Sequence, residues 1–453
     1  MRLGKHGEGF AKGYFESLGY EFVTENYRYE RAETDLIFKD DVKKLLVFVE
    51  VKTRRSKKYG EPEESITEKK MEQMVKSAQG FLMTHEGYDE YEKRFDVVFF
   101  FVAASAFAQK LKPGFDAKEY ARLLEMTERF ADTAKVPPAD PYPFGWTHEF
   151  RSETVGLDNL WDMWLSGDSV AVMNIRGTIA SEKSWMLDFY APMVPAEGSL
   201  KFGKEIFSYK LADDKNAAVH TGFLLGMHYL APSVIEKINE YYNKGVKDFI
   251  VCGHSQGAAI AYLMRSYLHY LPYGTIPADI TIKTYNSAAP KPGNLYYAYD
   301  FEYITRGGWS HRVVNQMDWV PQMPPTVQTR YDFKHNDPFT PVDSTLAATL
   351  GFFPRIVIGL IQKSVLGDMN DARDVLIKYT GAELYKVIKT FLPSFQEPKY
   401  VSTMDYTVTA SPVILMPTEE YRQKFVSTGG IAGAFVHHMM PAYYFLLQQE
   451  YMK

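Results

Sequence analysis

The sequence predicts an α/β protein with two domains, and three observations support this prediction. From about Phe144 onward, short β-rich runs alternate with segments of helical apolar spacing, as in a mostly parallel sheet covered by helices. Residues 1–100 show a shorter pattern of helix, strands, helix and strand. The Pro- and Ala-rich stretch between them, residues 101–140, is expected to be a linker with one helix near Tyr120 to Ala134.

The composition limits the classes of function. The 453 residues are 46% hydrophobic and 24% charged, which is ordinary for a globular protein. A net charge of −5 gives no general affinity for nucleic acid or anionic membranes, so any such affinity must be local. The single cysteine, Cys252, excludes an intrachain disulfide. No run reaches the roughly 20 apolar residues that a spanning helix needs, so we expect no transmembrane segment.

One apolar run has two interpretations that are equally favoured. Val97 to Ala108 follows Lys93 and Arg94 and ends in small residues, as a signal peptide does, but it also fits a buried strand that leads into a helix. The first eight residues contain no apolar core, so the chain as written is expected to be cytoplasmic. If the second domain were made separately, from a start near residue 90, we would expect it to be periplasmic or secreted.

The expected elements follow from apolar periodicity. In the first domain we expect helices at Gly7 to Leu18 and Glu68 to Met83, and strands at Glu33 to Lys39, Leu45 to Val51 and Phe95 to Phe101. In the second domain we expect strands at Ser169 to Ile175, Asp248 to Cys252, Ile280 to Tyr285, Arg312 to Asn315 and Val413 to Met416, and helices at Tyr229 to Tyr242 and Gly257 to Tyr270.

The strongest motif is Gly253-His254-Ser255-Gln256-Gly257, which lies between an apolar strand and a helix. This strand–turn–helix context is that of a nucleophile elbow, in which a strained serine is exposed above a sheet. Side chains at 253 and 257 would clash across the turn, so glycine is required there. Ser255 is therefore the candidate nucleophile.

A serine needs a base, and the base needs an orienting acid. In α/β-hydrolases these residues follow the serine in the order acid, then histidine. Asp318 comes just after the strand at 311–315, where that fold places its acid. Either His437 or His438, near the C-terminus, could be the base, and chemistry alone does not choose between them.

Residues 141–453 resemble the class 3 lipases through five motifs in the family's order. They are Arg176-Gly177-Thr178 with Trp185 to Asp188, Val219 to Phe223, the serine elbow, Asn286 to Asn294, and Val314 to Pro321. The resemblance implies Ser255 as nucleophile, Asp318 as acid, His438 as base, and Thr178 with the backbone N–H of Gln256 as oxyanion hole. His438 is preferred to His437 because Tyr443 supplies the family's aromatic residue five positions on.

The same resemblance implies a carboxylic-ester hydrolase that acts on acylglycerols or related lipid esters through an acyl-enzyme, without a cofactor. Gln256 stands where the family usually has leucine. Residues 344–395 form a helical, apolar insertion, expected to be an extra layer on the core or, alternatively, a lid or acyl-chain collar in peripheral contact with lipid. Arg176, Asp188 and His220 are expected to be scaffold residues.

The first domain contains a second candidate site, composed of Glu8, Asp35, Glu50 and Lys52, followed by Lys70. Paired strands could bring Asp35 and Glu50 together as oxygen ligands for Mg²⁺ or Mn²⁺. Lys52 projects to the same strand face as Glu50 and could orient a water or stabilise a phosphoryl transition state. The basic run at 52–58 is a candidate phosphate contact.

The spacing resembles the PD-(D/E)XK nuclease core, and residues 1–98 resemble the YraN (UPF0102) family. The motifs are Gly7-Glu8, Asn26-Tyr27-Arg28, Glu33 to Ile37, Phe48 to Arg54 and Arg94 to Val97. The resemblance implies a restriction-endonuclease-like α/β domain that cleaves DNA with a metal ion. Two alternatives follow from it, namely a DNA-processing endonuclease with a subordinate hydrolase domain, or a DNA-binding module whose metal site is vestigial.

Overall fold

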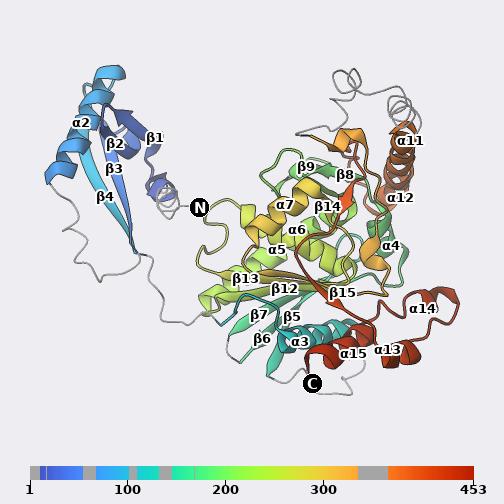
Figure 1. Ribbon diagram of the computed structural model, residues 1–453. Helices are drawn as coiled ribbons and strands as arrows, with labels where there is room; N and C mark the ends of the chain where they lie inside the picture. Colours follow the sequence, from blue (N-terminus) through green and yellow to red (C-terminus); the bar gives the residue numbers. More distant parts are fainter. Residues whose placement is uncertain are drawn as a thin grey trace, which may run out of the picture. The chain divides into compact units, whose positions relative to one another are not determined.

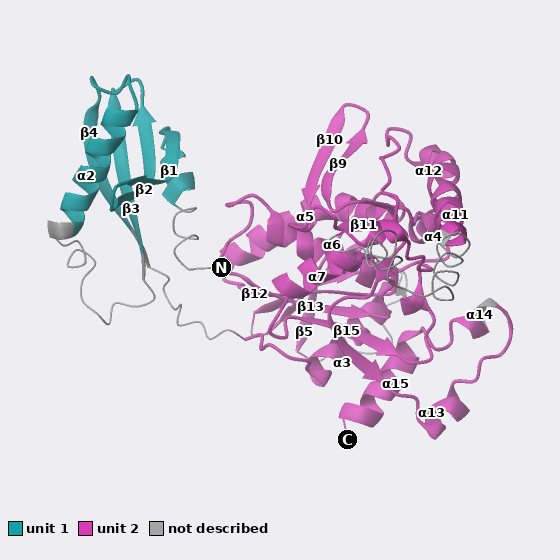
Figure 2. Cartoon of the chain, turned by 45° about the horizontal axis from the view of Figure 1, so that its top comes forward, with its two compact units in different colours: residues 1–108 teal, residues 109–453 magenta. Residues whose placement is uncertain are grey.

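The computed structural model describes residues 11–16, 18–54, 68–101, 110–131, 145–167, 169–334 and 366–452. The chain divides into two compact units, Met1–Ala108 and Gln109–Lys453 (Figure 2). Both units mix helices with strands, so the predicted two-domain α/β class is confirmed. Each unit is described by itself.

The first unit is a four-stranded sheet in the order β1-β2-β3-β4, with helix α2 on one face. Its elements are β1 (Glu21–Tyr29), β2 (Ala32–Asp40), β3 (Leu45–Arg54), α2 (Glu68–Thr84) and β4 (Glu92–Phe101). Residues 11–15 of the expected first helix pack on the other face through Phe15. Because both faces are covered, Leu36–Phe38 of β2 and Leu45–Val49 of β3 are continuous apolar runs.

The second unit is built on a seven-stranded sheet in the order β17-β15-β13-β12-β7-β6-β5. Adjacent strands are parallel except in the pairs β5–β6 and β6–β7, so the sheet is mostly parallel, as predicted. The strands are β5 (Trp146–Arg151), β6 (Trp161–Ser166), β7 (Val170–Ile175), β12 (Asp248–His254), β13 (Thr281–Ser287), β15 (Ser310–Asn315) and β17 (Ser411–Leu415).

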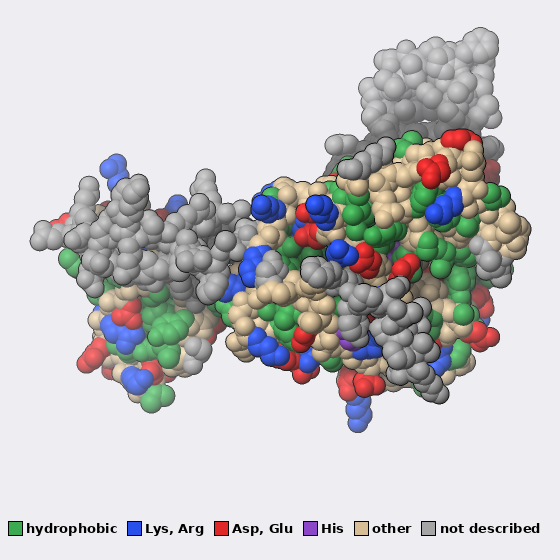
Figure 3. Space-filling model, turned by 90° about the horizontal axis from the view of Figure 1, so that it is seen from below, with side chains coloured by type: hydrophobic (Ala, Val, Ile, Leu, Met, Phe, Trp, Pro, Cys, Tyr) green, Lys and Arg blue, Asp and Glu red, His purple; other side chains and the backbone are tan. Residues whose placement is uncertain are grey.

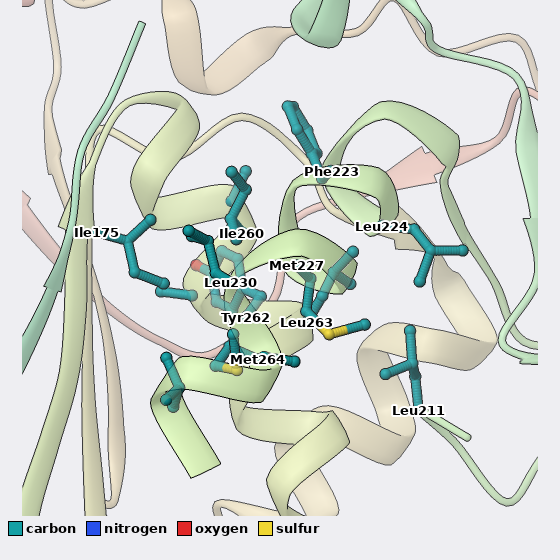
Figure 4. Packing of buried hydrophobic residues seen from close by; sticks show 14 of the residues in the cluster. Ile175, Leu211, Phe223, Leu224, Met227, Leu230, Ile260, Tyr262, Leu263 and Met264 are labelled. Carbon is teal, nitrogen blue, oxygen red and sulfur yellow. The ribbon is translucent and has the colours of Figure 1, made fainter. Parts of the chain in front are cut away.

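Helices cover both faces of this sheet (Figure 1). On one face, α5 (Thr221–Asn243) and α6 (Gln256–Tyr270) form the larger apolar core, in which Met227 and Leu263 lie close together (Figure 4). On the other face, α3 (Ala117–Glu128) packs beside α15 (Met440–Tyr451). These helices do not cover the carboxyl ends of the parallel strands. Ser255 follows β12 and Asp318 follows β15 at this edge of the sheet.

Helix α3 corrects the expected domain boundary, because the second unit begins at Gln109 rather than at 141. Tyr120, Leu123 and Leu124 of α3 are buried against the sheet. Glu119 also pairs with the buried Lys283 of β13 at 2.7 Å. The segment looked like a linker because the Pro-rich sequence that follows α3 breaks the periodic pattern.

The insertion expected at 344–395 is helical over its described part. It consists of α11 (Leu366–Ile377), a π-helical turn (Lys378–Glu383) and α12 (Leu384–Phe391), whereas 344–365 lies outside the described residues. Ile388 of α12 and the following Phe395 join the larger core. These contacts favour an extra layer on the core for this part of the insertion.

The ambiguous run at 97–108 is a strand as far as it is described. Val97 and Val98 pair with Glu50 and Val51 of β3, and residues 102–108 lie outside the described residues. Within the described part of the chain, no helix combines the length and apolar character needed to cross a membrane.

Shorter elements complete the second unit. They are η2 (Arg129–Ala131), α4 (Glu182–Phe189), β8 (Met193–Pro195), β9 (Glu197–Phe202), β10 (Glu205–Lys210), β11 (Ala218–His220), β14 (Gly293–Asn294), α7 (Leu295–Ile304), η3 (Val320–Gln322), η4 (Arg330–Asp332), β16 (Tyr406–Thr407), α13 (Glu419–Lys424) and α14 (Gly430–Ala434). Of these, α4 follows β7 and borders the candidate active site.

Candidate active site

Ser255 lies at a sharp turn between β12 and α6, with φ 59° and ψ −131°. Few residues other than glycine adopt this backbone region without strain. A Cβ at Gly253 would lie 2.4 Å from the carbonyl carbon of Gly257, and a Cβ at Gly257 would lie 2.1 Å from the carbonyl oxygen of Ile175. The turn therefore has the steric requirements of a nucleophile elbow.

Asp318, which follows β15, is buried and is held by three donors. The Nδ1 atom of His438 lies 2.7 Å from its Oδ2, and the Tyr443 hydroxyl donates to the same oxygen at 2.7 Å. The backbone N–H of Val320 donates to Oδ1 at 3.0 Å. Because a carboxylate oxygen accepts hydrogen bonds, Asp318 directs the Nδ1 proton of His438 toward itself.

The neighbouring His437 faces a different partner. Its Nδ1 lies 2.8 Å from the hydroxyl of Tyr421, and Asn315 donates to its backbone oxygen at 2.8 Å. Asp318 accepts no hydrogen bond from the His437 ring among the described contacts. The structure therefore brings His438, and not His437, to the candidate acid.

Thr178 lies close to the elbow because the preceding residue is glycine. A Cβ at Gly177 would lie 2.7 Å from the carbonyl oxygen of His254. Gln256 is the first residue of α6, where the backbone N–H groups have no partner within the helix and remain able to bind an anion. The two predicted oxyanion-hole residues thus flank Ser255.

A polar network ties these residues to α4. Thr178 donates its hydroxyl proton to Asp188 Oδ2 at 2.8 Å, and the side chain of Gln256 donates to the Ser184 carbonyl at 2.9 Å. Burial raises the pKa of Asp188 to about 6, although hydrogen bonds from Gln256 and Thr178 oppose this rise.

Ser255 and His438 both line a cavity of about 870 Å³. The wall is largely apolar and aromatic, with contributions from Phe130, Trp185, Phe189, Trp319 and Phe435. Thr127 and Glu128 come from the end of α3, and Leu376 and Thr380 come from the insertion. Two segments outside the predicted motifs therefore help to shape the site.

The first unit brings its predicted carboxylates together. The 36↔49 register of β2 and β3 places Asp35 beside Glu50, and Asp35 Oδ2 accepts the N–H of Val51 at 2.7 Å. Glu50 Oε1 accepts from Lys52 at 2.6 Å and from Lys70 at 2.8 Å. Burial raises the pKa of Asp35, and the negative charge of Glu50 adds to this effect.

One atom of this cluster is unsatisfied. The Oε2 atom of Glu50 is buried and finds no hydrogen-bond partner among the described residues. The described side chains form no group of three or more metal-ligating residues, and Glu8 lies outside the described residues. Two close carboxylates with an orphan oxygen nonetheless suit a hard divalent cation.

The first unit matches the profile described as "Uncharacterised protein family UPF0102" over residues 7–100. A UPF0102 protein of Caldicellulosiruptor bescii is 43% identical over 101 residues, which cover 22% of this chain and 83% of that protein. One from Chlorobium phaeobacteroides is 42% identical over 96 residues, covering 21% of this chain and 73% of that protein. This chain belongs to the UPF0102 family through its first unit.

The second unit of this UPF0102 protein matches the profile "Lipase (class 3)" over residues 172–328. Over these residues the second unit is similar to the class 3 lipases. Solved structures similar to it include the Rhizomucor miehei lipase propeptide complex, with 19% identity, a TM-score of 0.36 and coverage of 47% of this chain and 64% of that chain. Lip2 lipase from Yarrowia lipolytica has 19% identity, a TM-score of 0.35 and coverage of 48% and 77%. The chain spans a little under two thirds of the first of these structures.

A buried series of hydrogen bonds behind the site was not predicted from the sequence. Tyr120 bonds to Ser287 at 2.5 Å, Ser287 bonds to His254 Nδ1 at 2.9 Å, and His254 Nε2 lies 2.7 Å from the His438 carbonyl. Burial lowers the pKa of His254 to about 3, so its ring is neutral. Its Nε2–H therefore donates to the backbone of His438.

Proposed function

We propose that the second unit hydrolyses carboxylic esters of acylglycerols or related lipids through an acyl-enzyme. The observation that carries this proposal is that Ser255 and His438 both line one largely apolar cavity, with Asp318 bonded to His438 from behind. An apolar cavity of this size suits an acyl chain, and the few polar groups at its base suit the ester carbonyl.

In this mechanism the Ser255 Oγ attacks the ester carbonyl carbon while His438 Nε2 takes the serine proton. The carbonyl electron pair moves to the oxygen, and the Gln256 N–H and Thr178 stabilise the resulting oxyanion. The oxyanion then collapses, the alcohol leaves with the proton from His438, and a water repeats the sequence to release the acid. Asp318 keeps the Nδ1 proton in place throughout both halves.

The cavity also suggests how a lipid reaches the site. Phe189, Trp319 and Met439 line the cavity and are also exposed, with 52%, 39% and 49% of their surfaces accessible. On the face seen in Figure 3, acidic and basic side chains are interspersed with apolar ones. Peripheral contact with lipid would depend on the exposed side chains of Phe189, Trp319 and Met439.

Covalent labelling tests this proposal. Incubation with a fluorophosphonate should add one phosphonyl group to Ser255, detectable by mass spectrometry of the digested chain, and should abolish turnover of p-nitrophenyl butyrate. The Ser255→Ala variant should take up no label and show no such turnover. Labelling of another residue, or ester turnover that survives in Ser255→Ala, would refute Ser255 as the nucleophile.

As a second candidate function, we infer that the first unit cleaves DNA with Mg²⁺ or Mn²⁺ held by Asp35 and Glu50. The buried orphan oxygen of Glu50 supports this inference. A bound divalent cation would polarise a phosphoryl oxygen and activate a water. Lys52, which now neutralises Glu50, would move toward the phosphate charge. A cytoplasmic location, which we propose for the chain as written, would give the unit access to DNA.

Nicking of branched DNA in the presence of Mg²⁺ should be lost in Asp35→Ala and in Glu50→Ala, while p-nitrophenyl butyrate turnover by the same preparations stays at the wild-type level. The retained esterase activity controls for the amount of protein and for folding of the second unit, and the melting temperature of each variant controls for folding of the first. Salt-sensitive DNA binding without nicking would select the DNA-binding alternative, and nicking that survives both substitutions would refute the metal site.

A further inference from the structure

The buried series of hydrogen bonds joins helix α3 to the backbone of His438. The Tyr120 hydroxyl of α3 lies 2.5 Å from Ser287 Oγ, which lies 2.9 Å from His254 Nδ1. The other ring nitrogen of His254, Nε2, lies 2.7 Å from the His438 carbonyl oxygen. The side chains of Tyr120, Ser287 and His254 are all buried. Because an unmade hydrogen bond is costly for a buried polar group, each member of the series depends on the next.

The series has one direction of donation, because burial keeps the His254 ring neutral. A carbonyl oxygen can only accept, so Nε2 carries the single ring proton and Nδ1 is an acceptor. Ser287 then donates its only proton to Nδ1, and its oxygen accepts the proton of Tyr120. Among the described hydrogen bonds, the Tyr120 hydroxyl has no partner other than Ser287. The series therefore begins at α3 and ends at the residue that carries the candidate base.

The same direction of donation keeps positive charge away from His438. The rings of His254 and His438 lie 4.9 Å apart, and His438 becomes positively charged when it takes the serine proton. A proton on His254 Nδ1 would have to be donated to Ser287, and Ser287 would donate to Tyr120 in turn. The Tyr120 proton would then have no acceptor among the described contacts, so the series opposes a second charge beside His438.

Helix α3 also contacts the helix that follows His438. Helix α15 begins at Met440 and packs beside α3 in the same apolar cluster, as Figure 1 shows. The Tyr444 hydroxyl of α15 donates to Glu125 of α3 at 3.2 Å. The segment that carries His438 is therefore supported from α3 at the His438 carbonyl and again at α15.

We propose that Tyr120 is a positioning residue for the candidate base. Through the hydrogen-bond series it holds the His438 carbonyl, and so keeps the His438 ring in place to take the proton of Ser255. This inference rests on the proposed ester hydrolysis, and Tyr120 lies outside residues 172–328, which match the lipase profile. No proton passes along the series, because the serine proton still goes to His438 and then to the leaving alcohol. A misplacement of about 1 Å at a reacting group can cost about 100-fold in rate, so a small shift of His438 is enough to be measured.

Tyr120→Phe tests the inference, because it removes only the hydroxyl at the start of the series. We expect kcat on p-nitrophenyl butyrate to fall by roughly tenfold. KM should change by less than about twofold, since Tyr120 is not among the residues that line the cavity. The rate of fluorophosphonate labelling of Ser255 should fall by about the same factor as kcat, because both depend on activation of the serine. Rates are normalised to the folded fraction, taken from a thermal melt.

Tyr285→Phe is the matched control. The Tyr285 ring is stacked with that of Tyr120 at a centroid distance of 5.9 Å, and its hydroxyl donates to Glu119 of α3 at 2.6 Å. It therefore anchors the same helix to the same sheet, but its described hydrogen bonds do not include Ser287. Whatever its melting temperature, its normalised kcat should stay within about twofold of the wild type. A fall in kcat in Tyr120→Phe no larger than that in Tyr285→Phe would overturn the inference.

A double-mutant cycle distinguishes positioning through the series from a general loosening of the fold. Ser287→Ala interrupts the series at its second member and should lower kcat at least as much as Tyr120→Phe does. Without the Ser287 hydroxyl, Tyr120 has nothing to bond to, so adding Tyr120→Phe to Ser287→Ala should lower kcat no further. Losses that multiply in the double variant would show that the two hydroxyls act independently, and would also overturn the inference.

The proposed function is checked with the same preparations. A wild-type chain that neither turns over the ester nor takes the fluorophosphonate label would remove the esterase and, with it, the role of Tyr120. Wild-type turnover and labelling that are unchanged in Tyr120→Phe would refute the positioning role alone and leave the esterase standing.

Discussion

Replacing His438 with alanine should lower kcat on p-nitrophenyl butyrate by on the order of 10⁶-fold, because among the described residues no other imidazole is hydrogen-bonded to the acid. His438 Nδ1 lies 2.7 Å from Asp318, which leaves Nε2 as the nitrogen available to Ser255. Initial rates at saturating substrate, normalised to the folded fraction, give the measurement. The fluorophosphonate should also label His438→Ala far more slowly, since the serine is no longer activated.

His437→Ala is the matched control, as it removes the same ring one residue earlier. The ring of His437 is hydrogen-bonded to Tyr421 and not to Asp318. We therefore expect kcat to fall by less than about tenfold. A fall in His437→Ala equal to that in His438→Ala, with both variants folded, would show that the base has been assigned to the wrong residue.

The two adjacent histidines, His437 and His438, also show what a sequence can and cannot predict about a site. The elbow is local, since its two glycines and the flanking strand and helix lie within one short stretch, and the acid follows from its place after a strand. The choice between two adjacent histidines depends on a contact that spans 120 positions, between His438 and Asp318. Only the resemblance to a family, through Tyr443, favoured His438 in advance.

The contribution of α3 could not be predicted for the same physical reason. Its amphipathic spacing suggested a helix, but spacing does not say which surface the apolar face covers. The Tyr120 contact with Ser287 spans 167 positions, and the Glu119–Lys283 pair is similarly distant. A helix that looked like part of a linker therefore lies behind the active site and contributes to its wall.

The first unit gives a contrasting case. The two-residue period of strands correctly predicted that Asp35 and Glu50 approach each other and that Lys52 shares the face of Glu50. Strand β1 was not predicted, because its half-exposed, mostly polar sequence resembles a loop. Lys70 of α2 also forms an ion pair with Glu50. This pair depends on how α2 packs on the sheet, which the strand period does not predict.

Asp318→Asn should lower kcat by on the order of 10⁴-fold while leaving the fold intact. The substitution preserves shape, but the amide nitrogen can donate toward His438 Nδ1 and so leave the ring proton on Nε2, where it blocks proton transfer from Ser255. The measurement is kcat on p-nitrophenyl butyrate, together with the melting temperature. KM should change little, since Asp318 is buried behind His438 and is not among the residues that line the cavity.

Tyr443→Phe distinguishes a change in the His438 tautomer from the simple loss of a hydrogen bond to Asp318. Tyr443 donates to the same Asp318 oxygen as His438 at 2.7 Å, so phenylalanine removes one donor but leaves the carboxylate to orient the ring. We expect kcat to fall by roughly tenfold or less, a cost comparable to the net contribution of one typical hydrogen bond. If Asp318→Asn lost no more activity than Tyr443→Phe, the carboxylate would not be fixing the proton on Nδ1, and Asp318 would be a structural anchor rather than the orienting acid.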